Sequence, residues 1–367
     1  MNIAITGQSG FIGNHLTNYL TQKCFNVIPV NKELFSNSQK LSCKLKDCSI
    51  VIHLAGMNRG LDKEVHECNV YLASQLVNAL EQENITPYLL FASSIQEEID
   101  NVYGRSKKEA TDIFVKWAKR NNATFTSLIL PNIFGPFCKP NYNSVIATFC
   151  YQLTHYQNPI VQVDKPLKLI YVNDLVEQIY KLIETSSKEH RVYLKADREL
   201  LVSEILTLLT HFKELYFEKN IFPCLKDAFT VQLFNTFRSY IDPDYFPIKG
   251  KVQSDERGNL VEAVKEKTGG QMFYSSTKPG KTRGNHYHRR KIERFYVIKG
   301  VGSIRIRKIG TDDVFEYKVS GDEPAFVDIP IHYAHNITNI GNEDLITLFW
   351  ANELFNPQDN DTFPENV

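Results

Sequence analysis

Residues 1–13 read MNIAITGQSGFIG, and this stretch decides the fold of the first part of the chain. An apolar run, Ile3–Ile5, leads into a loop in which Gly7, Gly10 and Gly13 recur at every third residue. Glycines at this spacing let the backbone approach a pyrophosphate, and the following helix offers N–H donors and the positive end of its dipole. We therefore expect a strand, a dinucleotide-binding turn and a helix. A tight turn without a ligand is the alternative.

Short apolar runs alternate with longer helical patterns through residues 1–240. This alternation predicts right-handed βαβ crossovers and a Rossmann-type, doubly wound parallel sheet with helices on both faces. The expected strands are Ile3–Ile5, Val27–Val30, Ile50–Leu54, Tyr88–Ala92 and Thr124–Ile129, and the expected helices are Ile12–Leu20, Val70–Glu83 and Lys107–Arg120.

The pattern changes near Asp242–Gly250, a segment that contains two prolines and a glycine. Short alternating strands follow, separated by turn residues, and they predict an all-β barrel or sandwich. With 367 residues the chain also exceeds one ordinary domain of roughly 100–200 residues. We predict two domains, residues 1–245 and 246–367. The expected strands of the second are Gln271–Ser275, Glu293–Ile298, Gly302–Arg307, Phe315–Val319 and Leu345–Trp350.

Charge and composition exclude several classes of protein. The 42 basic residues balance 42 acidic ones, which argues against a protein that binds nucleic acid or a membrane surface through a basic excess. No apolar stretch approaches the roughly 20 residues of a membrane span, and no secretory signal is visible at the N-terminus. The seven cysteines form no C-x-x-C pair and indicate reduced thiols. We expect a cytoplasmic protein.

The end of the second expected strand reports on the choice of cofactor. Sites that prefer NAD commonly place an acid there to bind the ribose 2′-hydroxyl, whereas this chain has Asn31 and Lys32. An asparagine and a lysine favour the 2′-phosphate of NADP(H), and the alternative is that Lys32 is an ordinary surface lysine. The residues expected to contact the cofactor are Gly7, Gly10, Phe11, Ile12, Gly13, Asn31, Lys32, Leu54, Ala55, Gly56, Tyr103 and Lys107.

A Y-x-x-x-K pattern, Tyr103 to Lys107, stands at the head of an expected helix. The spacing puts the phenol and the ammonium on one helical face, where the ammonium can make the phenol a usable acid or base. Upstream, Ser93 and Ser94 close a strand and offer hydroxyls to a substrate carbonyl. The pattern alone is common in surface helices; together with the glycine loop it predicts a reductase site.

These residues resemble the extended short-chain dehydrogenase/reductase family over about residues 1–240. The resemblance is carried by GQSGFIG, VIHLAG, SSI, YGRSK and the PNIFG stretch that contains Asn132. It implies that Tyr103 protonates the developing alkoxide, that Lys107 lowers the tyrosine pKa and that Ser94 polarises the carbonyl. Asn132 would line the substrate or cofactor pocket. Residues 96–101 resemble an insertion, which leaves the choice of Ser94 over Ser93 open.

Histidines near the other end of the chain predict a metal site. An H-x-H pair on one strand, His286 and His288, puts two imidazoles on one face. Glu293 on the next strand and His335 on a distant one complete a mixed set that suits Zn, Fe, Mn or Ni, with zinc preferred. The spacing matches the first signature of the cupin family, a jelly-roll barrel. The second cupin signature matches only in part, so His332 is expected to be structural or to face substrate rather than to bind metal.

Asp255–Gly258 reads Asp-Glu-Arg-Gly and resembles a stretch of the sugar-nucleotide epimerases built on the cupin fold. By that resemblance Arg257 would bind substrate, since a guanidinium pairs a phosphate bidentately. A turn between two strands is the alternative.

A dehydrogenase domain joined to a cupin resembles the bifunctional epimerase/reductases of capsular-polysaccharide and O-antigen biosynthesis. The resemblance implies a UDP-linked 2-acetamido-2,6-dideoxy-4-keto-hexose as substrate. The cupin would epimerise C3, and the reductase would then use NADPH to form the 2-acetamido-2,6-dideoxy-L-talose sugar, a precursor of N-acetyl-L-fucosamine. Tyr287, His332 and Tyr333 are candidates for moving the C3 proton. A homodimer or higher homo-oligomer is expected.

Two other interpretations stay open. One is a single-activity, NAD(P)-dependent sugar-nucleotide epimerase or dehydratase with a structural cupin. The other is a non-catalytic nucleotide sensor or scaffold, against which the intact pair of Tyr103 and Lys107 counts.

Overall fold

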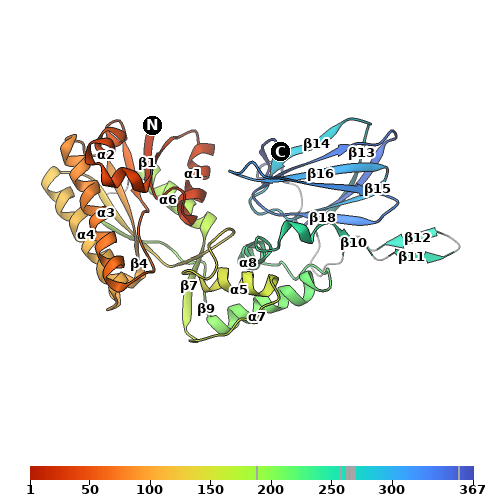
Figure 1. Cartoon of the computed structure of the whole chain (residues 1–367), viewed down its shortest axis with the longest axis horizontal. Coiled ribbons are helices and arrows are strands. Elements are labelled where there is room, and N and C mark those ends of the chain that lie inside the picture. The colour runs from red at the N-terminus through yellow and green to blue at the C-terminus, as the bar shows by residue number, and fades with distance from the viewer. Residues whose placement is uncertain (187–188, 251, 256–257, 262–263, 265–269, 354–355) are drawn as a thin grey trace. The chain divides into compact units, whose positions relative to one another are not determined.

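The computed structural model describes residues 1–186, 189–250, 252–255, 258–261, 264, 270–353 and 356–367. The chain forms two compact units. Unit 1 contains residues 1–148 and 163–202, and unit 2 contains residues 149–162 and 203–367. Figure 1 labels several elements of each.

Unit 1 is built on a six-stranded parallel sheet in the order β2-β1-β3-β4-β5-β8. Its four central strands are buried on both faces because helices cover each side, as in other parallel sheets. The strand order switches between β1 and β3, because β2 is added on one side of β1 and β3 on the other. Sheets of this kind bind ligands at the switch point, beyond the carboxyl ends of the strands. The strands are β1 Asn2–Thr6, β2 Asn26–Val30, β3 Ile50–His53, β4 Tyr88–Ser94, β5 Phe125–Leu130 and β8 Arg191–Tyr193.

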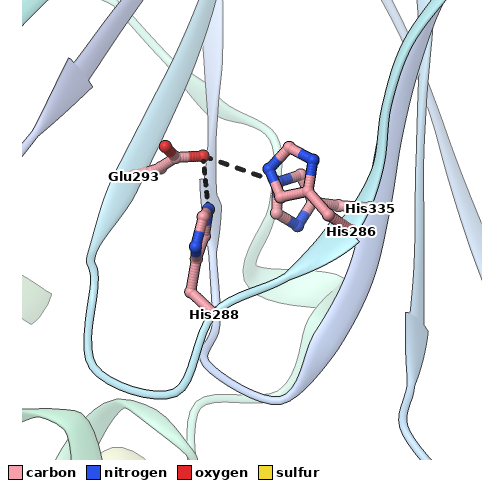
Figure 2. A group of neighbouring side chains, drawn as sticks. All are labelled: His286, His288, Glu293 and His335. Carbon is pink, nitrogen blue, oxygen red and sulfur yellow. Dashed lines mark ion pairs between the residues drawn. The ribbon is translucent and has the colours of Figure 1, made fainter. Parts of the chain in front are cut away.

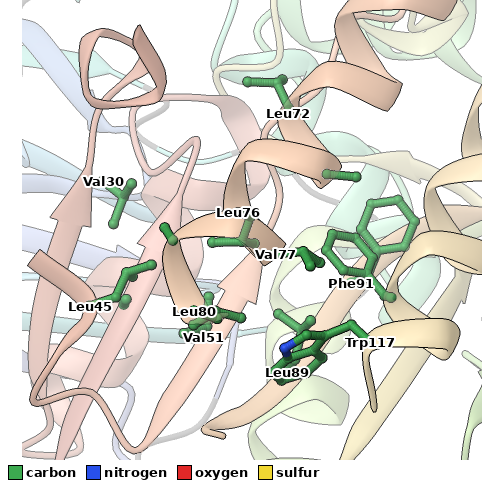
Figure 3. Packing of buried hydrophobic residues seen from close by; sticks show 14 of the residues in the cluster. Val30, Leu45, Val51, Leu72, Leu76, Val77, Leu80, Leu89, Phe91 and Trp117 are labelled. Atoms are coloured by element: carbon green, nitrogen blue, oxygen red, sulfur yellow. The ribbon is translucent and has the colours of Figure 1, made fainter. Parts of the chain in front are cut away.

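Helices cover the two faces of this sheet with separate apolar clusters. Alternate strand residues point to opposite faces, so Ala4 and Val51 pack with one helical layer while Ile3 and Ile52 pack with the other. Figure 3 shows part of the first cluster, which includes Trp117. That layer contains α2 Ser38–Leu45, α3 Asp62–Gln82 and α4 Val102–Asn121, and the opposite layer contains α1 Phe11–Gln22 and α6 Val172–Thr185.

Unit 1 also carries a small second sheet and short helical turns. The sheet has the order β6-β7-β9 and follows directly from the end of β5. Its strands are β6 Asn132–Phe134, β7 Pro166–Tyr171 and β9 Arg198–Leu201, and the short turns are η1 Lys32–Ser36 and η2 Ile95–Glu98. The ends of β1, β3, β4 and β5 lie at one edge of the large sheet because all four strands run parallel.

Unit 2 contains two five-stranded antiparallel sheets. One has the order β10-β18-β15-β20-β13 and the other β17-β16-β19-β14-β21. Buried side chains from both sheets, such as Phe295, Ile304 and Phe349, form one core. The strands are β10 Ile248–Lys249, β13 Gln271–Thr277, β14 Thr282–Tyr287, β15 Glu293–Lys299, β16 Val301–Lys308, β17 Val314–Ser320, β18 Ala325–Ile329, β19 Tyr333–Asn339, β20 Leu345–Ala351 and β21 Phe363–Pro364; β11 Val252–Asp255 and β12 Gly258–Val261 pair separately.

Helical segments within residues 149–162 and 203–245 belong to unit 2 as well. Arg294 on β15 binds Asp328 on β18 bidentately, with Nε–Oδ1 and Nη2–Oδ2 distances of 2.6 and 2.9 Å. Tyr216 donates its hydroxyl to the same buried carboxylate. This buried network connects the helical segment to the β-sheets. The helical elements are α5 Val145–Thr154, α7 Val202–Phe212, the π-helical η3 Lys213–Phe217, α8 Ala228–Arg238 and η4 Pro243–Tyr245.

The predicted fold class, a Rossmann-type sheet followed by an all-β cupin-like part, is confirmed. Apart from the short turn η4, helices give way to strands between Arg238 and Ile248, and the domain boundary at residue 245 stays a prediction. The two compact units, however, divide at residue 202, because the helices after this residue pack with the strands of unit 2. Within the described ranges, no helix has both the length and the apolar character needed to cross a bilayer.

Candidate functional site

The glycine loop follows β1 and leads into α1 as expected. Gly7 has a φ of +70°, and a Cβ atom there would lie 2.9 Å from the backbone nitrogen of Ala55. A Cβ atom on Gly13 would lie 2.2 Å from the carbonyl oxygen of Gly7, so only glycine lets the helix start this close to the strand. Phe11 and Ile12 form the first turn of α1, with their amides at the open end of the loop. The loop therefore has the shape and the donors of a phosphate cradle.

Asn31 and Lys32 lie immediately beyond β2, and both are exposed. The side-chain amide of Gln8, from the glycine loop, donates a hydrogen bond to the side-chain oxygen of Asn31. This contact joins the loop to the end of the second strand. Lys32 starts a short 3-10 turn, where its ammonium is open to a ligand.

The segment Leu54–Gly56 follows β3 and lies against the glycine loop. The amide of Ala55 donates to the hydroxyl of Thr6 at 3.1 Å, which also contacts Nδ1 of His53 at 2.8 Å. Burial, together with the charge of Lys107, lowers the pKa of His53 to about 3. His53 is therefore a neutral hydrogen-bonding group within the strand ends.

Lys107 is buried on α4 and points toward the ends of the strands. Its Nζ atom donates to the carbonyl oxygen of Ala92 at 2.9 Å and lies 5.7 Å from the ring centre of Tyr103. A Cβ atom on Gly56 would come within 3.3 Å of this ammonium. Burial lowers the pKa of Lys107 to about 8, and the nearby Glu97 only partly opposes this effect. The ammonium thus lies near both Gly56 and the ring of Tyr103.

The pKa of Tyr103 shifts in the direction opposite to the one that the family resemblance implies. Burial, with smaller contributions from Tyr142 and Glu97, raises it to about 12. A phenol with a raised pKa keeps its proton at neutral pH, but it gives that proton up less readily than an acid whose pKa lies near the working pH.

The two serines at the end of β4 have different surroundings. Ser93 is buried and donates its hydroxyl to the carboxylate of Glu97. Ser94 is only partly buried, and its oxygen accepts a hydrogen bond from the amide of Gln96 at 3.2 Å. The hydroxyl proton of Ser94 can therefore be directed to a substrate carbonyl. The choice of Ser94 over Ser93 stays a prediction.

Residues 96–101, which resemble an insertion in the sequence, form most of a compact turn beside α4. A Cβ atom on Gly104 would lie 2.0 Å from the carbonyl oxygen of Gln96, so glycine is required where the turn packs on the helix. Asn101 caps the helix by accepting the amide of Gly104 at 2.7 Å. The turn holds the first residues of α4, including Tyr103, next to the end of β4.

The two residues expected to contact substrate have separate outcomes. Asn132 begins β6 and donates its amide to the carbonyl oxygen of Lys168 at 3.2 Å, so part of its hydrogen-bonding capacity holds the small sheet together. Arg257 lies outside the described residues.

The four expected metal ligands come together in unit 2 (Figure 2). His286 lies on β14, opposite His335 on β19, and His288 follows β14 directly. Glu293 begins β15. One ligand atom from each residue lies within 4.8 Å of every other, and all but His286 are buried.

The hydrogen bonds of two imidazoles show that this group needs a positive charge. Nδ1 of His288 lies 2.6 Å from the carbonyl oxygen of Asp361, and Nδ1 of His335 lies 3.1 Å from that of Tyr333. Each Nδ1 must therefore carry a proton, which leaves the opposite Nε2 with a lone pair in the neutral ring. Both Nε2 atoms nevertheless face Oε2 of Glu293, at 3.2 and 3.4 Å.

Two lone pairs facing a carboxylate require either two extra protons or one shared cation. Burial, together with the charges of His335 and His288, lowers the pKa of His286 to about 4, which keeps this third ring neutral. Burial alone would raise the pKa of Glu293, but His288 and His335 hold it well below its usual range, so the carboxylate stays charged. The donor set, three imidazoles and one carboxylate, fits a divalent cation such as zinc.

His332 lies outside this group of four. It has a φ of +59° and is buried in the turn before β19. Its amide donates to the carbonyl oxygen of His288 at 2.8 Å, and its ring centre lies 6.1 Å from that of Tyr287. The expected structural or substrate-facing role of His332 stays a prediction.

Sequence reasoning missed three buried polar residues around the two centres. Asn69 holds the loop after β3 through both the amide and the carbonyl of Met57, at 2.7 and 3.0 Å. The carboxylate of Glu97 accepts hydrogen bonds from the hydroxyls of Ser93 and Thr111 and forms an ion pair with Arg191. Asp361 reaches the metal group from a distant part of the chain. None of them belongs to a motif. Asn69 is a polar residue between Cys68 and Val70, which is a weak signal of a buried role, whereas Glu97 stands between Gln96 and Glu98 and nothing local marks it.

Comparison with known families gives two matches along the chain. Residues 3–194 match the family described as NAD dependent epimerase/dehydratase, and residues 253–363 match the Polysaccharide biosynthesis C-terminal domain. A relative from Pseudomonas aeruginosa, UDP-2-acetamido-2,6-beta-L-arabino-hexul-4-ose reductase, is 30% identical over 374 residues, which cover 100% of this chain and 99% of the relative.

Solved structures include similar proteins of both full and partial length. The capsular polysaccharide assembling protein CapF from Staphylococcus aureus is 36% identical, with a TM-score of 0.66 and coverage of 100% of both chains. UDP-glucose 4-epimerase from Thermus thermophilus, in complex with NAD, is 17% identical with a TM-score of 0.51. The match covers 57% of this chain and 83% of the epimerase chain. At that identity the second likeness concerns the fold alone.

Proposed function

We propose that this chain is a bifunctional UDP-sugar enzyme. It belongs to the NAD-dependent epimerase/dehydratase family and, like CapF, joins that domain to a second, C-terminal domain. Its substrate is a UDP-linked 2-acetamido-2,6-dideoxy-4-keto-hexose. Residues 246–367 epimerise C3, and residues 1–245 reduce the C4 ketone to give UDP-2-acetamido-2,6-dideoxy-L-talose. The observation that carries the proposal is that one chain holds both a reductase arrangement around Tyr103 and a group of four metal ligands.

The reductase half rests on the edge of the parallel sheet. The loop of Gly7, Gly10 and Gly13 would hold the pyrophosphate of a nicotinamide cofactor, and Lys107 would hold the nicotinamide ribose beside Gly56. The bound cofactor would supply the hydride. Ser94 donates a hydrogen bond to the C4 carbonyl oxygen, and Tyr103 delivers a proton to the alkoxide.

NADP(H) is the proposed cofactor within this nicotinamide-dependent family. Lys32 is exposed immediately after β2 and would meet the 2′-phosphate, whereas NAD-binding sites commonly place an acid at this point. The hydrogen bond between Gln8 and Asn31 keeps the end of β2 next to the glycine loop.

The epimerase half rests on His286, His288, Glu293 and His335, which would hold one divalent cation, with zinc as our choice. Such a cation would supply positive charge beside the C4 carbonyl and so make the neighbouring C3 proton more acidic. Tyr287, His332 and Tyr333 are the side chains proposed to move that proton. Epimerisation precedes reduction because the C3 proton is acidic only while the C4 ketone is present.

The proposal includes three further statements. The seven free thiols agree with a cytoplasmic location, where cysteines stay reduced. The active form is a homodimer or higher homo-oligomer. Arg257 binds the substrate phosphate.

Consumption of NADPH tests the proposal against a single-activity epimerase or dehydratase. The purified enzyme is incubated with the UDP-keto-sugar and NADPH, and absorbance and product are followed together. One NADPH consumed for each sugar, with inverted C3 and a hydroxyl at C4 in the product, supports two activities. Turnover of sugar without net oxidation of NADPH would establish the single-activity alternative.

A further inference from the structure

Asp361 lies beside the metal group although about 70 residues separate it from the ligands His288 and Glu293. It precedes β21 and is only 6% exposed. Its φ of +44° is in the left-handed region, so the backbone turns sharply at this residue. Two different parts of Asp361, the carboxylate and the backbone carbonyl, contact the segment that carries the ligands.

The carboxylate of Asp361 binds three successive backbone amides. The N–H of Arg289 lies 3.2 Å from each carboxylate oxygen, that of Arg290 lies 2.9 Å from Oδ2, and that of Lys291 lies 2.8 Å from Oδ2. Successive N–H groups that converge on one anion form a concave site for negative charge. Residues 289–292 are the whole connection between His288 and Glu293, so these bonds fix the spacing of two ligands.

The backbone carbonyl of Asp361 accepts the Nδ1 proton of His288 at 2.6 Å. This bond fixes the tautomer and the orientation of the ring, and it leaves Nε2 to face Glu293. The following residues extend the hold, because β21 pairs with β14 and places Pro364 opposite His286. The segment around Asp361 therefore contacts three of the four ligands or their immediate connections.

We infer that Asp361 is the positioning residue of the metal site: its carboxylate sets the turn between two ligands, and its carbonyl orients the first of them. The inference rests on the proposed metal site and adds to it a residue that no ligand motif contains. A residue of this kind changes metal affinity without binding the metal. Loss of such an outer contact typically weakens metal binding about 10–100-fold.

Three variants of the full-length protein test this role. Asp361→Gly removes the carboxylate and tolerates the positive φ, and Asp361→Asn keeps the shape but loses the charge. Asp359→Asn is the matched control: it makes the same charge change two residues away, where, among the described residues, the carboxylate of Asp359 pairs with the guanidinium of Arg290. Each metal-free protein is titrated with Co²⁺, whose absorption reports coordination geometry, and Zn²⁺ affinity is then measured by competition with a chelator.

The inference predicts about 10–100-fold weaker binding and an altered Co²⁺ spectrum for Asp361→Gly, a smaller loss for Asp361→Asn and no change for Asp359→Asn. Wild-type affinity and spectrum in both Asp361 variants would overturn it while leaving the metal site intact. If the wild-type protein itself binds neither ion, the proposed metal site fails and this inference fails with it. Thermal unfolding of the metal-free proteins distinguishes a general loss of stability from a specific loss of metal affinity. If Asp361→Gly does not fold, the comparison of Asp361→Asn with the wild type tests the inference.

Discussion

Oε2 of Glu293 lies 3.2 Å from Nε2 of His288, and the opposite nitrogen of the same ring is held by a backbone carbonyl. The contact is therefore set by the fold and is not a chance pairing of flexible side chains. Because His335 faces the same carboxylate oxygen, the three residues define one point at which positive charge is required. This relationship leads to the first prediction.

Replacing Glu293 by glutamine should remove the negative charge that draws a cation to this point. We expect metal affinity to fall by at least about 100-fold, since even outer contacts of a metal site contribute about 10–100-fold. Metal content after dialysis measures the effect, with Glu316→Gln on the exposed side of β17 as the control. A chelator should lower the melting temperature of the wild type and of the control but not of Glu293→Gln, because bound metal stabilises the folded state. Equal metal content in all three proteins would contradict the assignment.

Replacing Tyr103 by phenylalanine should remove the proton donor of the reduction. Because a positioned acid contributes about 10²–10⁴-fold, NADPH oxidation should fall by that factor. Tyr71→Phe is the control, since that hydroxyl only donates to the carbonyl oxygen of Phe35 on the surface of α3. The measurement is the rate of NADPH oxidation at saturating sugar. Metal binding should be the same in both variants, and an unchanged rate in Tyr103→Phe would exclude the proposed role.

Burial of Lys107 predicts how the stability of the cofactor-free protein depends on pH. The folded-state pKa is lowered to about 8 from an ordinary value of 10.5, so the unfolded chain binds more protons between these values. The free energy of unfolding should therefore rise with pH across this window, by on the order of 3 kcal/mol from this group. Lys107→Met should lose that rise. Denaturant unfolding from pH 7 to pH 10 measures it, and parallel curves for both proteins would contradict the prediction.

The exposed ammonium of Lys32 predicts the cofactor preference. Lys32→Glu should weaken binding of NADPH by removing the partner of the 2′-phosphate and adding a repulsive charge, while NADH should lose far less. Lys46→Glu, an exposed lysine beyond α2, is the control for net charge. Fluorescence titration with both cofactors gives the ratio of affinities. A wild-type preference for NADH, or equal losses for both cofactors, would show that NADP(H) is the wrong choice.

Local patterns predicted the parts of the fold that depend on neighbouring residues. The run Ile3–Ile5 and the glycines after it determine a strand, a turn and a helix by their own conformational preferences. The H-x-H pair and Glu293 are close in sequence, so their convergence could be inferred from strand geometry.

Contacts between distant segments could not be predicted in this way. Tyr216 joins unit 2 through Asp328, more than 100 residues later, and the helices after residue 202 therefore pack with the strands. Nothing near Asp361 marks it as a partner of His288, because its role depends on a carbonyl and on amides that every residue has. The raised pKa of Tyr103 likewise arises from burial, which the Y-x-x-x-K pattern does not report.

The central claim is that the two centres catalyse successive steps on one sugar, and isotope exchange tests it most directly. The UDP-keto-sugar is incubated in heavy water without NADPH, with wild-type enzyme, Tyr103→Phe and His288→Ala, and deuterium at C3 is measured by nuclear magnetic resonance. The account predicts deuterium at C3 with the wild type and with Tyr103→Phe, and its loss with His288→Ala. No exchange with the wild type, or undiminished exchange with His288→Ala, would contradict it.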